Sequence, residues 1–410
     1  MTANRETSRL RILLYVQHLT GVGHYVRTSE IAKALAQWHD VMLTDGGWPV
    51  PRAGLEQVAI LPLPRVRRQG SELASLQGES GIAAVMQARQ QCLWKTIRTF
   101  RPDALVVEHY PFSKWILEDE IAGMAAEIRA ANPAVKIICS VRDIQPRTRH
   151  EACSEDEYAQ EVTNRLRAHF DGILIHGDPA FTRLEAQLPF LSATGLRLAY
   201  TGIVSERPVT NPVRIDVAAA EPPFILASVG GGKDRANLLQ HTLEAWQRLR
   251  QSGEFAGWKL VLCPGLGESD DELAERARRH GEHVMLRPFG ADFLPLLQAA
   301  ALSVSCAGYN TCANILETRC RAVLVPDPEM SDQTIRAALL AARHVAVVVP
   351  PAGLDGTKLA AAMLKCLAAS PPGHDIALDG AERTRVLIEE IAGSGPQAVR
   401  ARFSPSSVSW

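Results

Sequence analysis

Short apolar runs alternate with amphipathic stretches along most of the chain. The run "RILLYVQH" near the start predicts a buried strand. Residues 25–38 follow it with helical spacing, and the residues expected on the buried face of this helix are Ile31, Ala34, Leu35 and Trp38. The chain therefore opens with one strand followed by one helix.

Three more apolar runs continue this pattern, at residues 103–109, 135–141 and 172–177. They are continuously apolar rather than alternating, which is typical of strands that a parallel sheet covers on both faces. Residues 205–223 hold four prolines and show no period, so they predict a linker. Behind the linker the alternation restarts at "PFILASV", followed by an expected helix at 234–251.

This order predicts an α/β chain with two doubly wound, parallel-sheet domains of the Rossmann-like kind that face a cleft. The expected boundaries are an N-terminal domain at 1–208, a linker at 209–222, a C-terminal domain at 223–395 and a frayed tail at 396–410.

Composition and charge exclude several classes of protein. A chain of 410 residues is long enough for two domains, and its formal net charge of −1 gives no reason to expect nucleic acid as a partner. Its eight cysteines are scattered and form no usual zinc spacing, so we expect reduced thiols, a cytoplasmic location and no metal site. No apolar run reaches the ~20 residues of a membrane span, which leaves only peripheral membrane contact open.

Two glycines and a histidine interrupt the first strand–helix turn, in the stretch "TGVGHYVR". Such turns lie at the carboxyl end of a parallel sheet, where ligands bind, and glycine lets the backbone approach a ligand closely. His24 falls at the start of the helix, where the helix dipole favours a neutral imidazole that can accept a proton. The spacing is not the dinucleotide fingerprint, and a structural turn with a capping histidine is the alternative.

The second domain opens in a similar way. Gly230, Gly231, Gly232 and Lys233 follow its first strand, and free N–H groups there would suit a diphosphate. The stretch is not a Walker A loop, and a tight turn alone is the alternative.

Two later stretches of this domain carry polar groups at expected helix starts. Gly308, Asn310 and Thr311 form a short turn, and Asp332 and Gln333 begin a further helix; these side chains suit ribose or sugar hydroxyls, or else helix capping.

A polar insert at residues 62–80 carries Arg65, Arg67 and Arg68. A charge run of this kind is typical of a solvated loop. The alternative is a loop over the cleft that meets an acidic or phosphate-bearing acceptor.

Taken together, these motifs resemble glycosyltransferases of the GT-B fold across nearly all of residues 10–350. The stretches that carry the resemblance are "GVGHYVR", "FRPDALVVEHYPF", "ILIHGDP", "SVGGGKD", "AGYNT" and "VLVPDPEMSDQTIRA". The second domain is similar to that of the peptidoglycan N-acetylglucosaminyl transferase family that forms lipid II. The resemblance implies that a nucleotide sugar binds mainly to the C-terminal domain and the acceptor mainly to the N-terminal one.

The resemblance also implies roles for individual residues. The donor contacts it implies are Gly21, Gly23, Gly230, Gly231, Gly232, Lys233, Phe289, Gly308, Asn310, Thr311, Asn314, Asp332 and Gln333. The arginines expected near the acceptor are Arg27, Arg65, Arg67 and Arg68. One position departs from the family, which places Glu where this chain has Asn314; asparagine keeps an acceptor oxygen and loses the charge that would grip both ribose hydroxyls.

The reaction implied is transfer of a sugar from a nucleoside diphosphate sugar, UDP-linked by resemblance, to an acceptor hydroxyl. The expected base is His24, with Glu108 second and His109 third, and the glycine turn with Lys233 would offset the leaving charge in place of a metal. His18 is expected to be structural. Two alternatives stay open: a nucleotide-sugar hydrolase in which His24 activates water, and a non-catalytic nucleotide-sugar-binding protein.

Overall fold

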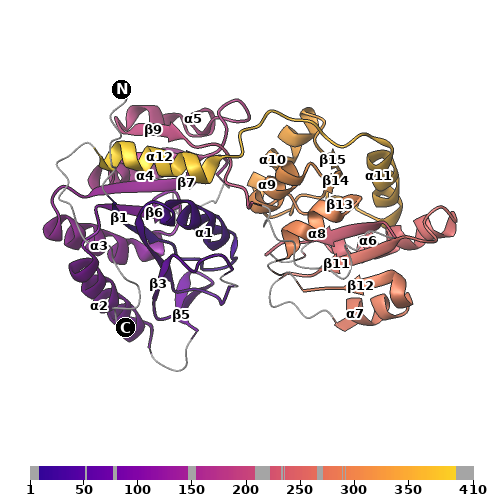
Figure 1. Cartoon of the computed structure of the whole chain (residues 1–410), viewed down its shortest axis with the longest axis horizontal. Coiled ribbons are helices and arrows are strands. Elements are labelled where there is room, and N and C mark those ends of the chain that lie inside the picture. The colour runs from indigo at the N-terminus through magenta and orange to yellow at the C-terminus, as the bar shows by residue number, and fades with distance from the viewer. Residues whose placement is uncertain are drawn as a thin grey trace. The chain divides into compact units, whose positions relative to one another are not determined.

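The computed structural model describes residues 9–50, 53–76, 81–145, 154–207, 222–231, 234, 236–265, 271–288, 290 and 292–393. The chain divides into two compact units (Figure 1). The first comprises the described residues up to Val204 and those from Asp379 onward, and the second runs from Ser205 to Leu378. Nearly all of the expected linker and the whole expected tail lie outside the described residues.

The first unit is built on a parallel sheet with the strand order β3-β2-β1-β6-β7-β8-β9. Its strands are β1 (Arg11–Tyr15), β2 (Asp40–Asp45), β3 (Ala59–Pro62), β6 (Ala104–Glu108), β7 (Lys136–Arg142), β8 (Gly172–His176) and β9 (Arg197–Tyr200). Its helices are α1 (Gly23–Ala36), α2 (Ile82–Phe100), α3 (Glu118–Ala131), α4 (Glu155–His169), α5 (Leu184–Gln187) and α12 (Gly380–Ala392), with short 3-10 turns η1 (Trp115–Leu117) and η2 (Pro189–Ala193).

Strand β1 shows why this sheet is covered on both faces. Leu13 and Tyr15 point into a core with α2, α3 and α4, whereas Ile12 and Leu14 point into a second core with α1 and α12. Successive residues of a strand face opposite sides, so a continuous apolar run needs apolar partners on both. The prediction of a parallel sheet covered on both faces is confirmed.

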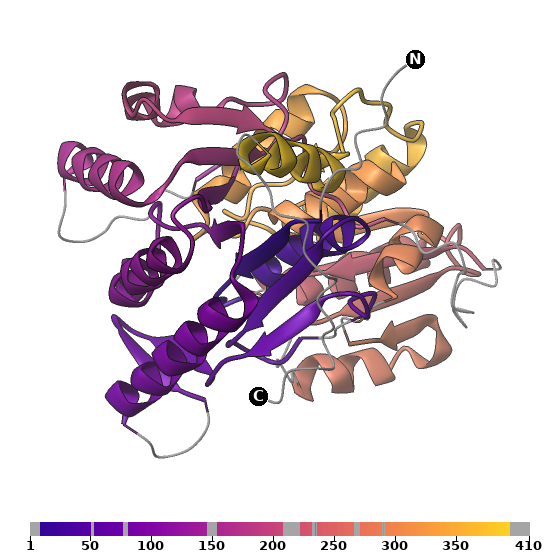
Figure 2. The same ribbon diagram turned by 60° about the vertical axis from the view of Figure 1, so that its left-hand side comes forward.

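Helix α12 returns from the second unit to complete the first. Its Leu387 and Ile388 pack into the same core as Ile31 and Leu35 of α1, and both ribbon views show it among the elements of this unit (Figures 1 and 2). The sequence analysis assigned residues up to 395 to the second domain. The structure groups α12 with the first unit instead, because its apolar face covers α1.

Trp38 does not lie on the buried face of α1 as expected. The helix ends at Ala36, and the Trp38 side chain is 52% exposed. The Arg385 guanidinium of α12 lies 5.1 Å from the centre of its ring. The helical spacing that included Trp38 therefore ran past the end of the helix.

Part of the polar insert at 62–80 forms a two-stranded antiparallel hairpin, β4 (Val66–Gln69) and β5 (Glu72–Ser75). The Val66 N–H donates to the Gly46 carbonyl at 2.9 Å, and the Arg68 N–H donates to the Leu19 carbonyl at 3.1 Å. Leu19 and Gly46 follow β1 and β2, so the hairpin borders the carboxyl edge of the first sheet.

The second unit has a parallel sheet with the strand order β12-β11-β10-β13-β14-β15. Its strands are β10 (Phe224–Ser228), β11 (Lys259–Cys263), β12 (Val284–Leu286), β13 (Leu302–Ser305), β14 (Ala322–Leu324) and β15 (Val347–Val348). Its helices are α6 (Leu238–Gln251), α7 (Asp271–Arg278), α8 (Phe293–Ala299), α9 (Tyr309–Thr318), α10 (Ser331–Ala342) and α11 (Gly356–Ala368), with a 3-10 turn η3 (Gly281–His283).

One face of this second sheet packs on α6, α7 and α11, with Trp246 buried at its centre. Two parallel α/β sheets, one in each unit, confirm the predicted α/β class with two Rossmann-like domains. None of the described helices is both long and apolar enough to cross a membrane.

Candidate functional site

The strand order places the first candidate site at the point where the first sheet changes winding direction. Strand β1 pairs with β2 on one side and with β6 on the other, all parallel. Loops that leave such a pair diverge at its carboxyl end, and ligands of doubly wound sheets bind there. His24 lies in the first turn of α1, directly after β1, and Glu108 is the last residue of β6.

These two residues are in direct contact. His24 Nδ1 lies 2.6 Å from Glu108 Oε1, and the Glu108 side chain is 1% exposed against 23% for His24. The Arg27 guanidinium donates to the same Oε1 atom. Lys114, which no motif indicated, donates its ammonium to Oε2 and lies 3.2 Å from the Glu108 carbonyl oxygen.

The contacts fix the protonation state of the pair. An ionised carboxylate only accepts hydrogen bonds, so His24 carries its proton on Nδ1, and Nε2 keeps a free lone pair. Burial, together with the charges of Lys114 and Arg142, lowers the pKa of His24 to about 3, against the opposing effect of Glu108. Burial opposes ionisation of Glu108, yet contact with His24, Lys114 and Arg27 holds the pKa of its carboxyl well below its usual range.

His109 lies beside His24, with the two ring centres 4.8 Å apart. Its Nε2 atom is 3.3 Å from the Arg142 guanidinium, and its Nδ1 atom has no hydrogen-bond partner among the described residues. Burial, then His24 and Arg142, lower the pKa of His109 well below its usual range. The structure therefore brings the three expected catalytic side chains together and adds Lys114 and Arg142 to them.

The arginines expected near the acceptor have different surroundings. Arg27 is buried against Glu108, because it lies three residues after His24 and so shares its helix face. Arg65 reaches the Gly47 carbonyl at 3.4 Å, whereas Arg67 and Arg68 bond within the hairpin, to Gln69 at 3.1 Å and Gly70 at 3.0 Å. Acceptor contact by Arg65, Arg67 and Arg68 stays a prediction.

A buried ion pair supports the loops around this edge. Arg89 of α2 makes a two-point contact with Glu120 of α3, at 2.8 and 2.7 Å, and Tyr15 donates to the same carboxylate. Arg89 also donates to Gln17 at 2.9 Å and to the Pro64 carbonyl at 2.8 Å. The pair thus holds the segments that follow β1 and β3 in place.

His18 is buried, as expected of a structural histidine. Its Nε2 atom lies 2.8 Å from the Trp48 carbonyl oxygen. Gly21 and Gly23 lie between His18 and the His24 turn, where Gly23 begins α1.

The second unit repeats the arrangement at its own change of winding direction, between β10 and β13. Gly230 follows β10 with a φ of 68°, and a Cβ atom there would lie 3.2 Å from Thr311 Oγ1. Gly308 precedes α9, whose N-cap makes no side-chain hydrogen bond to the first turn. Gly230 and Thr311 therefore meet at the carboxyl edge of this sheet.

The start of α6 differs from the expectation. The helix begins at Leu238 rather than at 234, and the Asp234 carboxylate accepts from the N–H groups of Leu238 at 2.6 Å and Leu239 at 2.9 Å. The N-terminus of α6 is thus capped by the chain itself. Gly231 lies in the turn after β10, whereas Gly232, Lys233 and Phe289 lie outside the described residues.

Asn314 of α9 is 2% exposed, and its Nδ2 atom donates to Glu206 Oε1 at 2.9 Å. Its Oδ1 atom has no hydrogen-bond partner among the described residues. The charge that asparagine lacks is thus present beside it, on Glu206. Glu317, one helical turn further along, is engaged by Ser205 at 2.7 Å and Arg207 at 3.1 Å.

The two polar residues at the start of α10 act within the fold. Asp332 is buried and lies 3.2 Å from the Arg336 guanidinium, which donates to the Ala307 carbonyl at 3.1 Å. This pair supports the loop that leads to Gly308 and Asn310. Gln333 accepts from the Asp327 N–H at 3.1 Å.

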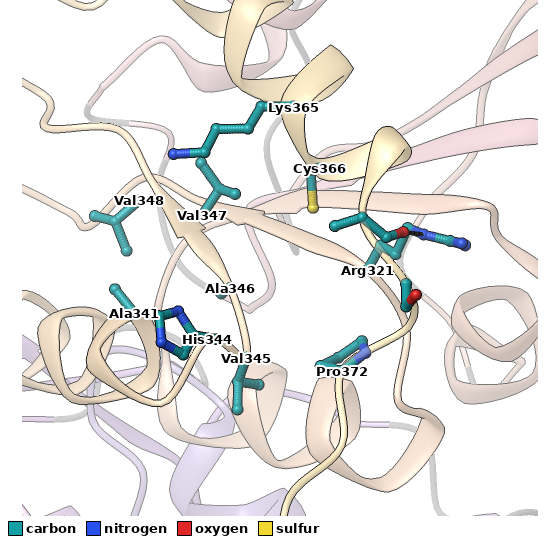
Figure 3. Close-up of a pocket in the computed structure, with 12 residues that line it drawn as sticks. Arg321, Ala341, His344, Val345, Ala346, Val347, Val348, Lys365, Cys366 and Pro372 are labelled. Carbon is teal, nitrogen blue, oxygen red and sulfur yellow. Dashed lines mark hydrogen bonds between the residues drawn. The ribbon is translucent and has the colours of Figure 1, made fainter.

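A cavity of about 360 Å³ lies elsewhere in the second unit (Figure 3). Arg321 and Ala346 in its wall directly precede β14 and β15, so it borders the amino edge of the sheet, opposite Gly230 and Gly308. In Figure 3 the Lys365 amine points away from Arg321, so its basic groups do not converge.

Comparison with known proteins supports the reading of the second unit. Residues 227–375 match the family model of the glycosyltransferase family 28 C-terminal domain. Most of the second unit is thus similar to a family 28 C-terminal domain. Gly230, Gly308, Thr311 and Asn314 all belong to it.

One curated relative is the UDP-N-acetylglucosamine--N-acetylmuramyl-(pentapeptide) pyrophosphoryl-undecaprenol N-acetylglucosamine transferase of Opitutus terrae. It is 31% identical over 157 residues, which cover 35% of this chain and 41% of that relative. The alignment thus spans less than half of the relative. Together with the family 28 match it confirms the resemblance that the motifs indicated.

Solved structures share the fold over most of the chain. The glycotransferase of kitacinnamycin superposes with a TM-score of 0.58 at 16% identity, over 94% of this chain and 99% of that one. The spinosyn forosaminyltransferase SpnP gives 0.56 at 14% identity, over 95% and 96%. The described residues thus have the GT-B fold, and the family 28 match falls in the second unit.

Proposed function

We propose that this chain is a glycosyltransferase that moves a sugar from a nucleoside diphosphate sugar, UDP-linked by the likeness to its curated relative, to an acceptor hydroxyl. The observation that carries the proposal is the His24–Glu108 pair at the carboxyl edge of the first sheet, in a chain that also holds a family 28 domain.

The geometry suits His24 for the role of general base. Its Nδ1–H is held by Glu108, so Nε2 can accept the proton of an acceptor hydroxyl as the oxygen attacks the anomeric carbon. The Glu108 carboxylate then stabilises the imidazolium that forms. His109 and Arg142 lie beside this base and suit contact with the substrate.

The charges around His24 favour an anionic reaction partner. Arg27 and Lys114 both contact the Glu108 carboxylate, and the charges of Lys114 and Arg142 oppose protonation of His24 in the unliganded protein. A diphosphate beside these groups raises the pKa of His24 again, since an opposite charge favours the protonated form. The base would therefore strengthen when the negatively charged donor is present.

The donor side of the proposal rests on α9. The start of this helix, where Thr311 lies beside Gly230, has the positive end of a helix dipole and suits the diphosphate that leaves in the reaction. Glu206, held by Asn314, suits the ribose hydroxyls of the nucleoside.

A binding screen on the whole chain tests the donor side. We expect one series of nucleoside diphosphates and their sugars to raise the melting temperature, since a ligand that binds only the folded protein stabilises it. Thr311→Ala should weaken that effect. A matched control, Thr99→Ala, changes a threonine of α2 whose hydroxyl bonds only to its own helix, to Lys95 and Thr96. No stabilisation by any nucleotide would contradict the proposal.

Product analysis separates the transferase from the hydrolase. With the stabilising donor, we expect the sugar to appear on an acceptor, in amounts that depend on the acceptor added. Free sugar that forms at the same rate without an acceptor would favour hydrolysis, and binding without either product would favour a non-catalytic role.

A further inference from the structure

Lys114 is the one cation at Glu108 that lies outside every motif. Its backbone has a φ of 65°, in the left-handed region that few residues other than glycine adopt, directly before η1. Its side chain is 8% exposed and ends on Glu108. The fold thus holds a lysine in an uncommon backbone conformation, with its ammonium buried against the candidate site.

The three donors divide the Glu108 carboxylate between them. His24 and Arg27 both donate to Oε1, and Lys114 donates to Oε2. Lys114 also bonds to the carbonyl oxygen of the same residue at 3.2 Å, so it fixes the side chain and the backbone together. Lys114 therefore binds the second carboxylate oxygen.

We propose that Lys114 is a positioning residue for His24: by occupying Glu108 Oε2 it holds the carboxylate turned toward His24, which fixes the proton on Nδ1, and by its own positive charge it opposes protonation of Nε2, which stays open.

The charges that face His24 come from four elements. Arg27 lies on α1 with it, Glu108 and His109 come from the end of β6, Lys114 precedes η1, and Arg142 ends β7. Without Lys114, the positive charge of Arg27 balances the negative charge of Glu108. Of the groups named here, Arg142 is then the one positive charge left unbalanced near His24. A protonated His24 would then fit beside Glu108 with less repulsion, so Lys114 acts against protonation of the base.

Nitrogen NMR of the full chain labelled in histidine reads this state directly. Two-bond proton–nitrogen spectra distinguish the two neutral tautomers from the cation, and the signal that disappears in His24→Gln assigns His24. In the wild type we expect the Nδ1–H tautomer at neutral pH, with no protonation of His24 as the pH is lowered to 5.

In Lys114→Met we expect the His24 titration midpoint to rise by about one to two pH units, the usual effect of one nearby charge. Lys114→Gln keeps a donor for Oε2 and loses the charge, so it should show the same rise even where Lys114→Met fails to fold. Lys114→Arg keeps the charge and should titrate like the wild type. Lys33→Met, which removes a lysine that pairs with Glu30 on α1, is the matched control and should change nothing.

The benefit of this role rests on the proposed function, in which His24 is the base. The NMR test does not depend on that function. A shift of the His24 midpoint in the two charge-removing variants supports the role of Lys114 even if no sugar transfer is found. If the tautomer and the midpoint of His24 are the same in the wild type and in folded Lys114→Gln, Lys114 does not set the state of His24 and the proposal is overturned.

Discussion

Replacing Glu108 by Gln is the substitution whose effects the structure defines most fully. The carboxylate takes hydrogen bonds from His24, Arg27 and Lys114, and the side chain is 1% exposed. An amide of the same shape offers one acceptor oxygen, and its NH₂ group cannot accept from a cation. At least one buried cation therefore loses its partner.

Removing one partner of a buried ion pair costs about 3 to 5 kcal/mol of unfolding free energy. We expect Glu108→Gln to lose an amount in this range in urea unfolding at pH 7. Glu127→Gln is the matched control, because Glu127 pairs with an exposed arginine, Arg98, at 2.7 Å. That surface pair should cost at most about 1 kcal/mol.

The same substitution should remove the base. An amide cannot stabilise the imidazolium, and an NH₂ group turned toward His24 would favour the wrong tautomer. Donor turnover by folded Glu108→Gln should fall about 100- to 10,000-fold, the usual contribution of a general base. A folded Glu108→Gln protein with wild-type turnover would refute the reasoning that joins Glu108 to His24.

Three other measurements test the surroundings of the two sites. Arg89→Met leaves the buried Glu120 carboxylate without its cation, so urea unfolding should show a loss of about 3 to 5 kcal/mol, and a loss below about 1 would show that the pair is dispensable. Gly230→Ala places a Cβ atom 3.2 Å from Thr311 Oγ1 on a backbone with a φ of 68°. We expect a loss of about 1 to 2 kcal/mol in unfolding free energy and weaker nucleotide binding in calorimetry. An unchanged nucleotide affinity would contradict the donor site. Burial lowers the pKa of His176 from 6.5 to about 3, so the unfolded chain binds the extra proton between these values. His176 should therefore contribute up to about 1.4 kcal/mol per pH unit to the fall in unfolding free energy below pH 6.5, and His176→Asn should remove that contribution; an unchanged slope would contradict the assignment.

Sequence patterns predicted the fold because its strands are continuously apolar. β1, β6, β7, β8 and β10 are buried on both faces, and such runs stand out in any sequence. Strand β2 was not identified, because its run begins and ends with aspartate, Asp40 and Asp45, which are buried and paired in the structure. Helix α12 was identified neither as an element nor as part of the first unit, since only its contact with α1 shows where it belongs.

The candidate site was predictable where a glycine turn marked it. His24 and Gly230 follow the first strand of each unit, and strand order alone then brings Glu108 and Thr311 beside them. Lys114 carried no signal, because its role depends on a left-handed backbone that places it on Glu108.

The surroundings of Glu206 and Asp234 were equally hidden. Glu206 reaches Asn314 across more than a hundred positions of sequence, and nothing in a single sequence joins the two. The cap that Asp234 makes on α6 depends on where that helix begins, which is the least certain feature of a helical pattern.

Turnover by His24→Gln tests the central claim most directly. Release of nucleoside diphosphate would be followed in the wild type and the variant, with the donor that stabilises the chain and pooled acceptors that carry hydroxyl groups. We predict that His24→Gln binds the donor with wild-type affinity and releases diphosphate at least about 100-fold more slowly. A His24→Gln protein that binds the donor and transfers its sugar at the wild-type rate would contradict the assignment of His24 as the base.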